Sequence, residues 1–124
     1  MLETRTLITG SLLLLAAVSG VMVSALGRPL NIAVSTAHKL LALSSVVLAV
    51  ILVRTMQKAG GIDTLAVVMI VVMGVLFLSL FISGAFLSFD KPVSILLRAV
   101  HAALPFFALF TTLVLAYLRL RKNL

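Results

Sequence analysis

Hydrophobic residues fall in four long runs along this chain, and few polar side chains interrupt them. The runs cover Leu7–Leu26, Ile32–Val53, Leu65–Phe89 and Val93–Leu118. About 20 residues of α-helix cross a hydrocarbon core of about 30 Å, so each run is long enough to span a bilayer. Backbone polar groups must be paired in lipid, which predicts helices, and no segment has the alternating polarity of a membrane β-strand.

Composition supports the same interpretation. Of the 124 residues, 63% are hydrophobic and 10% are charged, which is outside the range of soluble globular domains. We expect an all-α fold and a single integral membrane domain over residues 1–124, with helices at about 6–26, 32–53, 64–89 and 93–119. The chain has no cysteine, which excludes a disulfide, an iron–sulfur cluster and covalently attached haem.

The net charge of +7 comes from cations that flank the apolar runs. No basic stretch is long enough for a nucleic-acid-binding arm, so we do not expect the protein to bind nucleic acid. We expect these charges to anchor the ends of the helices. One side of the bilayer would hold Arg5, Arg54, Lys58, Arg119, Arg121 and Lys122, and the other Arg28 and Lys91, with Lys39 and Arg98 just inside helix starts. This bias predicts cytoplasmic N- and C-termini in a prokaryotic inner membrane.

The first run also has some features of a signal peptide. Arg5 precedes an apolar stretch, and Val23-Ser24-Ala25 fits the small-x-small pattern of a cleavage site. A near copy of this segment recurs in the middle of the chain, where no signal peptidase site is expected. We therefore expect a retained helix.

A pattern in the first half of the chain recurs in the second half. Matches among leucine and valine are expected by chance in a membrane protein, but ordered matches among glycine, serine, proline and histidine are not. The matched pairs are Gly10 and Gly74, Ser19-Gly20 and Ser83-Gly84, Arg28-Pro29 and Lys91-Pro92, and His38 and His101. Residues 1–58 and 59–124 are therefore predicted to be two copies of one helical hairpin.

Two hairpins that each cross the bilayer twice enter it from the same side. That arrangement predicts a parallel repeat, with a pseudo-twofold axis along the membrane normal. The expected product is a transmembrane four-helix bundle with small residues at its contacts. Pro29 and Pro92 are expected at or just before the starts of the second and fourth helices, where a missing N–H costs nothing.

The two histidines of the chain carry the strongest functional signal. His38 and His101 each lie nine residues after a matched proline, about 13 Å along the helix at the usual rise. Their helices run in the same direction, so both imidazoles are expected at one depth in the outer leaflet. Ionisable residues at membrane depth are costly and point to function. Two converging imidazoles supply the two axial nitrogens that a b-type haem needs.

Polar residues precede both histidines on roughly the same helix face. Ser35 and Arg98 lie three residues before the two histidines, and Asn31 and Ser94 lie seven residues before them. The propionates of a haem bound here would point outward. Arg98, and with it Lys39, could pair with them.

These features resemble the small four-helix bis-histidine b-type membrane cytochromes. The resemblance rests on His38, His101, Gly20, Gly84 and Arg98. It implies that the histidines clamp one haem b, that the glycines make room at its edges, and that electrons pass near the outer face. Quinone, a redox partner protein or a second copy of the chain would be the partner. The chain departs from the cytochrome b561 family, which uses four histidines for two haems, so it would not relay electrons across the bilayer alone.

Other interpretations stay open at this point. The histidines could be structural or proton-handling residues of a haem-free accessory subunit in a larger complex, or could ligate copper or zinc, for which two are few. Enzyme chemistry has less support. Glu3, Asp63 and Asp90 lie in termini or loops, which argues against a proton-coupled exporter. No Ser/His/Asp set or phosphate-binding loop is present, so an electron carrier is favoured over an enzyme.

Overall fold

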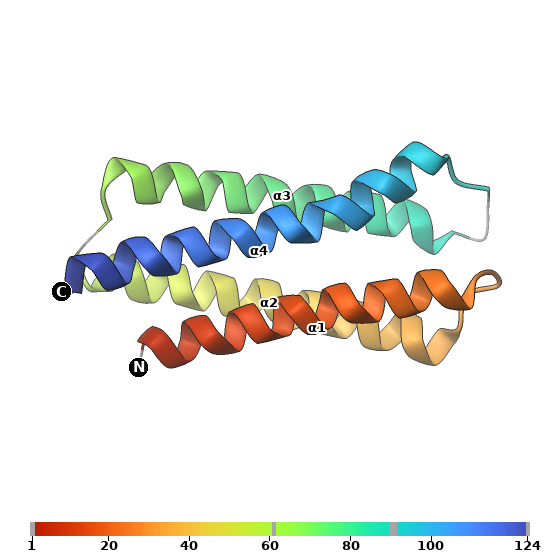
Figure 1. The fold of residues 1–124 in the computed structure, drawn as a ribbon, viewed down its shortest axis with the longest axis horizontal. Helices are drawn as coiled ribbons and strands as arrows, with labels where there is room; N and C mark the ends of the chain where they lie inside the picture. Colours follow the sequence, from red (N-terminus) through yellow and green to blue (C-terminus); the bar gives the residue numbers. More distant parts are fainter. Residues whose placement is uncertain (1, 61, 90–91, 124) are drawn as a thin grey trace.

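A computed structural model describes residues 2–60, 62–89 and 92–123, and they form four α-helices joined by short loops (Figure 1). The helices are α1 (Leu2–Leu26), α2 (Ile32–Lys58), α3 (Thr64–Ser88) and α4 (Ile95–Asn123). Each is long and apolar enough to cross a membrane, which confirms the predicted number of spans and fits a membrane protein. Asp90 and Lys91, which the sequence placed in the last loop, lie outside the described residues.

The helix ends follow from local side-chain chemistry. Asn31 and Asp63 precede α2 and α3, and their side chains accept hydrogen bonds from the N–H groups of Val34 and Ala66 at 3.1 and 2.9 Å. Gly27 and Gly60 follow α1 and α2 with φ of 72° and 71°, a left-handed conformation that favours glycine at a helix end. The loops are thereby closed within a few residues.

The fourth helix begins in the same way. The hydroxyl of Ser94 accepts a hydrogen bond from the Leu97 N–H at 3.2 Å. Asn31 and Ser94, which the sequence assigned to a polar stripe, therefore serve as helix caps. Pro29 and Pro92 each lie three residues before the first residue of α2 and α4, as predicted.

Successive helices run in opposite directions along the long axis (Figure 1). Both chain termini and the α2–α3 loop lie at one end, called here the terminal end, and the other two loops lie at the loop end. Helix α1 packs against α2 and α4, and α3 packs against α4. The α1–α2 and α3–α4 hairpins therefore meet through α1 and α4.

The buried apolar side chains gather on one side of the histidines. We call residues 2–18, 39–60, 62–82 and 102–123, between the histidines and the terminal end, the terminal half. Its interior is built from small and medium-sized residues, as is usual where membrane helices approach closely. The buried apolar residues are Leu13, Ala16, Ala49, Leu52, Met56, Ala66, Met73, Phe77, Ala108 and Leu115.

Hydroxyl groups in the terminal half bond to their own helices. Thr9, Ser45 and Thr112 are almost completely buried. Each donates to the carbonyl four residues earlier, at 2.8, 2.8 and 2.9 Å respectively. These bonds satisfy the hydroxyls where water is absent, so they fill the interior without calling for a ligand.

The part of the bundle between the histidines and the loop end, residues 21–37, 85–89 and 92–100, is called here the loop half. Among its described side chains, Ser35 alone is buried, at 8% exposure. Ile32 and Ile95, the first residues of α2 and α4, are 83% and 86% exposed. The loop half thus has no apolar core of its own among the residues described.

Candidate functional site

The two histidines meet where the packed terminal half ends. His38 and His101 each lie six residues into their helices, α2 and α4. Their rings approach edge to face, with centroids 6.3 Å apart and planes at 79°. The structure therefore places both imidazoles at one level of the bundle and in contact with each other.

Each histidine packs on a glycine of the preceding helix. A Cβ atom added at Gly20 would lie 3.0 Å from Cε1 of His38, and one at Gly84 would lie 3.1 Å from Cε1 of His101. Both distances are tighter than ordinary carbon contacts, so any larger residue would push the ring away. The glycines, predicted at the edges of a haem, contact the histidines that would hold it.

A serine beside each glycine binds the histidine ring. The hydroxyl of Ser19 lies 3.1 Å from Nδ1 of His38, and that of Ser83 lies 2.7 Å from Nδ1 of His101. Nδ1 of His38 also lies 2.9 Å from the carbonyl oxygen of Ala16. The α1 and α3 helices thus fix both the position and the rotation of the rings.

The contacts of Nδ1 bear on which ring nitrogen carries hydrogen. The Ala16 carbonyl can only accept, so we assign the hydrogen of His38 to Nδ1. The Ser83 hydroxyl lies 2.7 Å from both the Ser79 carbonyl oxygen and Nδ1 of His101, and its one hydrogen can serve either acceptor, so this contact does not assign the hydrogen of His101. In His38, Nε2 keeps its lone pair, which is the arrangement that metal-ligating histidines usually have.

The separation of the rings can be compared with that of two imidazoles on one metal ion. With metal–nitrogen bonds of about 2.0 Å and about 1.2 Å from nitrogen to ring centre, two imidazoles on opposite sides of one ion have centroids about 6.4 Å apart. The observed centroid distance of 6.3 Å equals that value, but the edge-to-face contact of the rings is not itself that arrangement. Across the described residues no three His, Cys, Asp or Glu side chains gather, so a zinc site with three or four protein ligands lacks its ligands here.

The other predicted site residues lie around this pair without a bond to it. Ser35 is buried, and Arg98 and Lys39 are exposed. The contacts of the described residues include no hydrogen bond from these three side chains to either histidine. Their roles toward a haem and its propionates stay predictions.

Sequence reasoning missed the parts played by Ser19 and Ser83. It used both serines only to align the repeat, although the signal was present, since each directly precedes a matched glycine. It also missed Pro105, which lies inside α4, four residues after His101. Proline has no N–H, so Pro105 cannot donate the helical hydrogen bond to the carbonyl of His101, four residues earlier. In α2 the corresponding residue is Ala42, whose N–H can donate to the carbonyl of His38.

Arg28 makes a connection that the sequence did not predict. Its guanidinium donates to the carbonyl oxygens of Phe89 and Leu87, at 2.5 and 2.9 Å. These carbonyls lie at the C-terminal end of α3, where peptide oxygens lack helical partners and a cation is favoured. The loop of the first hairpin is thereby tied to the second hairpin at the loop end.

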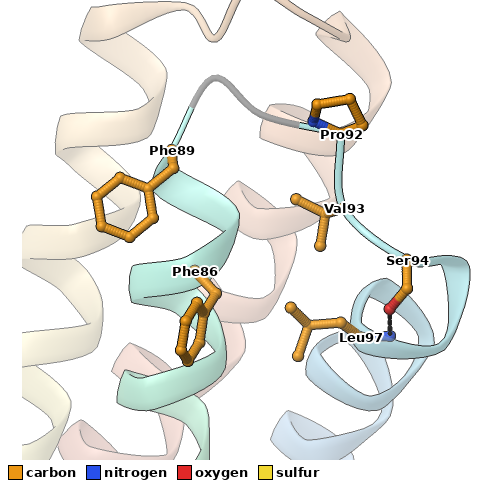
Figure 2. A pocket seen from close by; sticks show the side chains of 6 residues that line it. All are labelled: Phe86, Phe89, Pro92, Val93, Ser94 and Leu97. Carbon is orange, nitrogen blue, oxygen red and sulfur yellow. Dashed lines mark hydrogen bonds between the residues drawn. The ribbon is translucent and has the colours of Figure 1, made fainter.

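An open pocket of about 280 Å³ lies between α3, α4 and the residues that precede α4 (Figure 2). Figure 2 shows the phenyl rings of Phe86, in α3, and Phe89, just after it, on one side, and side chains of the loop and of α4 on the other. The lining residues are Phe86, Phe89, Pro92, Val93, Ser94 and Leu97. Leu97 and Ser94 lie four and seven residues before His101, hence on roughly its face of α4.

Comparison of the chain with protein-family models, curated proteins and solved structures finds no match. The functional argument therefore rests on the geometry of the site.

Proposed function

We propose that this protein is a membrane-embedded b-type cytochrome that holds one haem between His38 and His101. The observation that carries the proposal is the histidine pair itself, with centroids 6.3 Å apart and Nδ1 of each ring hydrogen-bonded by the neighbouring helix. With the hydrogen on Nδ1 of each ring, both Nε2 atoms would be able to hold one iron. A bound haem would supply reversible one-electron chemistry.

The surrounding residues support the proposal. The terminal half packs apolar side chains on one side of the histidines, and the loop half buries no apolar side chain among those described. In this proposal Gly20 and Gly84 hold the histidine rings close to α1 and α3. Arg98 and Lys39, which are exposed and lie one turn or less from the histidines, would pair with the propionates, and Ser35, which is buried, lies three residues before His38.

The duplicated hairpin is part of the proposal. The serine, glycine and histidine of the first hairpin make the same contacts as their counterparts in the second. A pseudo-twofold axis along the membrane normal, passing between the rings, would relate the two sets. Such an axis suits a haem, because it presents equivalent ligands to the two faces of one macrocycle.

The proposed role is electron transfer near the loop end, with quinone, a redox protein or a second copy of the chain as the exchange partner. The excess of lysine and arginine near the terminal end favours a cytoplasmic position for that end in a prokaryotic inner membrane. The described cations near that end include Arg5, Arg54, Lys58, Arg119, Arg121 and Lys122. The chain would act as an electron carrier and not as a stand-alone enzyme.

One observation favours a second candidate, a haem-free accessory subunit. An edge-to-face contact with hydrogen-bonded Nδ1 atoms is also what two structural histidines would make. The two candidates differ in one measurable property, because only the cytochrome is coloured.

The test is the absorption spectrum of the purified protein after dithionite reduction. The expected result is a low-spin bis-imidazole b-type spectrum that both His38→Ala and His101→Ala abolish. A preparation that is colourless and takes up no haem on titration would overturn the proposal. So would a spectrum that survives either substitution.

Four glycine variants provide a matched control for the packing. Gly20→Ala and Gly84→Ala place a methyl group against a histidine ring, whereas Gly10→Ala and Gly74→Ala place it in open space. Overpacking costs about 1–3 kcal/mol, so the first pair should weaken haem affinity about fivefold or more. The second pair should leave it unchanged.

A further inference from the structure

Three cations of the first hairpin lie close together at the terminal end, where α1 begins and α2 ends (Figure 1). Arg5 of α1 donates a hydrogen bond to the hydroxyl of Thr55 in α2 at 2.5 Å, which holds its guanidinium against that helix. Lys58 lies three residues after Thr55 and four after Arg54, and residues at these spacings are neighbours on a helix surface. We call Arg5, Arg54 and Lys58 the basic cluster.

The basic cluster has no carboxylate partner among the described side chains. The one described carboxylate is that of Asp63, and Lys122 binds it at 2.8 Å. Arg54 and Lys58 are exposed, and the described contacts give neither an acidic partner. Like charges four residues apart on a helix repel each other, so an anion between these two side chains would be favoured.

The electrostatics of the helix ends accounts for only part of the basic cluster. The C-terminal end of a helix attracts cations, which favours Lys58 at the end of α2. Arg5 lies near the N-terminal end of α1, where the same dipole disfavours a cation. Its position beside two further cations therefore has an electrostatic cost that a bound anion would offset.

The surface of α2 that adjoins the basic cluster is apolar and exposed. Val47, Val50 and Ile51 are 51%, 51% and 41% exposed. They lie seven, four and three residues before Arg54, hence on roughly its face of the helix, and we call them the apolar strip. Cations at one end and an apolar strip leading away from them match a phospholipid, whose phosphate and acyl chains follow the same order. A free phosphate ion would use the cations alone.

We propose that the basic cluster binds the headgroup of an anionic phospholipid in the leaflet at the terminal end, with an acyl chain along the apolar strip. Arginine guanidinium groups bind phosphate oxygens in pairs, and the lysine ammonium adds a further charge. A zwitterionic lipid would bring a quaternary ammonium group to a site with no described carboxylate to receive it. The site therefore selects a headgroup of net negative charge, such as that of phosphatidylglycerol. The proposal is independent of haem.

The test is lipid binding to the intact chain in non-ionic detergent, measured by native mass spectrometry during lipid titration. Phosphatidylglycerol should bind about tenfold more tightly than phosphatidylcholine with the same acyl chains, and a higher ammonium acetate concentration should reduce the difference. Arg54→Gln and Lys58→Gln should each weaken phosphatidylglycerol binding about fivefold, which corresponds to about 1 kcal/mol per cation near an anionic lipid surface. Circular dichroism verifies that each variant remains helical.

Two further variants distinguish a specific site from a general attraction between the terminal end and anionic lipid. Arg121→Gln removes the same charge from an exposed position in the last turn of α4 and should weaken phosphatidylglycerol binding less than about twofold. Thr55→Val keeps the net charge but removes the hydroxyl that holds Arg5, and should weaken binding about threefold.

Each result contradicts a different part of the proposal. Equal losses in Arg54→Gln, Lys58→Gln and Arg121→Gln would overturn the site and leave a diffuse attraction to the leaflet. Equal affinity for the two lipids would overturn the selection of an anionic headgroup. Displacement of phosphatidylglycerol by an equal concentration of inorganic phosphate would overturn the phospholipid, since the acyl chains would then contribute nothing. Unchanged binding in Thr55→Val would overturn the role of Arg5.

Discussion

The terminal and loop halves of this bundle are made by the same four helices, yet they differ in what fills their interiors. In the terminal half, Leu52 and Leu115 are 3% and 1% exposed, and buried alanines and hydroxyl residues fit between them. In the loop half, Leu96 is 71% exposed, and no apolar side chain among those described is buried. Apolar composition alone therefore does not pack membrane helices together.

We attribute the difference between the two halves to how closely the shapes of their side chains fit together. Lipid is as apolar as leucine, so helices associate where small residues and interlocking side chains give close contact. The histidines lie at the boundary, where that close contact stops. A site placed there has packed side chains on one side and, among the described residues, no buried apolar side chain on the other.

The largest effect that would sharpen this comparison is the response to the proposed haem. On that proposal, haem at about 100 times its Kd would stabilise the folded protein by about 2.7 kcal/mol, a factor of about 100 in the unfolding equilibrium. We expect that protection in the amide hydrogen exchange of residues 32–37 and 95–100, with less in the terminal half. Equal protection in both halves would contradict the comparison, and a protein lacking both histidines provides the control.

Truncation of a leucine should have the next largest effect, and the loss of stability should differ between the two halves. Leu115→Ala opens a void in the packed terminal half and should lower the free energy of unfolding by about 2–3 kcal/mol. This value is in the lower part of the range for buried leucines in soluble proteins, because lipid already solvates apolar groups. Leu97→Ala only enlarges an existing open pocket and should cost less than about 0.5 kcal/mol. Reversible unfolding in mixed micelles measures both, and similar losses would show that the loop half is packed.

Removal of the tie between hairpins should have a smaller effect. Arg28→Gln loses charge-assisted hydrogen bonds to two carbonyls at the end of α3, and we expect a loss of about 1 kcal/mol because the guanidinium is exposed. Hydrogen exchange should quicken at residues 86–89 and stay unchanged in the terminal half. Arg54→Gln, an exposed cation in the terminal half, is the control. Unaltered exchange in Arg28→Gln would mean that the tie does not hold the loop half.

The smallest expected effect is a pH dependence confined to the terminal end. Lys122 donates to the Asp63 carboxylate at 2.8 Å, and this bond, together with the Ala66 N–H, lowers the pKa of Asp63. A lowered folded pKa means that Asp63 stabilises the fold above its unfolded pKa of about 3.9, and that this contribution is lost as pH falls through the lower folded value. Melting temperatures between pH 6 and 3 should therefore decline less in Asp63→Asn than in the wild type. A parallel decline would exclude the ion pair as a contributor.

Much of the fold could be predicted from the hydrophobic pattern, because helices in lipid must be long and apolar. The prediction erred mainly at the ends. Helix α2 continues from the predicted 53 to Lys58, and α4 runs from Ile95 to Asn123 where 93–119 was expected. An apolar run marks the part of a helix within the hydrocarbon, whereas the backbone stays helical until a cap or a left-handed glycine ends it.

The histidine pair was predictable from the sequence, but the residues that support it were not. Two histidines at equal distances from matched prolines predicted a pair at one depth. The serine contacts depend on side-chain rotation, and serine is common at helix contacts, so the repeated Ser19-Gly20 and Ser83-Gly84 pairs marked the repeat but not the contacts with the rings. The Arg28 contact joins residues 59 and 61 positions apart, and no local pattern encodes it.

The way each ring is anchored makes the site modular. His38 takes its glycine and serine contacts from α1, and His101 takes its own from α3, so each hairpin positions one histidine through its own residues. On the proposed function, two copies of residues 1–58 would present the same pair of imidazoles as the intact protein. The covalent link between the hairpins instead permits the surroundings of the two histidines to diverge, as Pro105 and the single Nδ1 contact of His101 among the described residues illustrate.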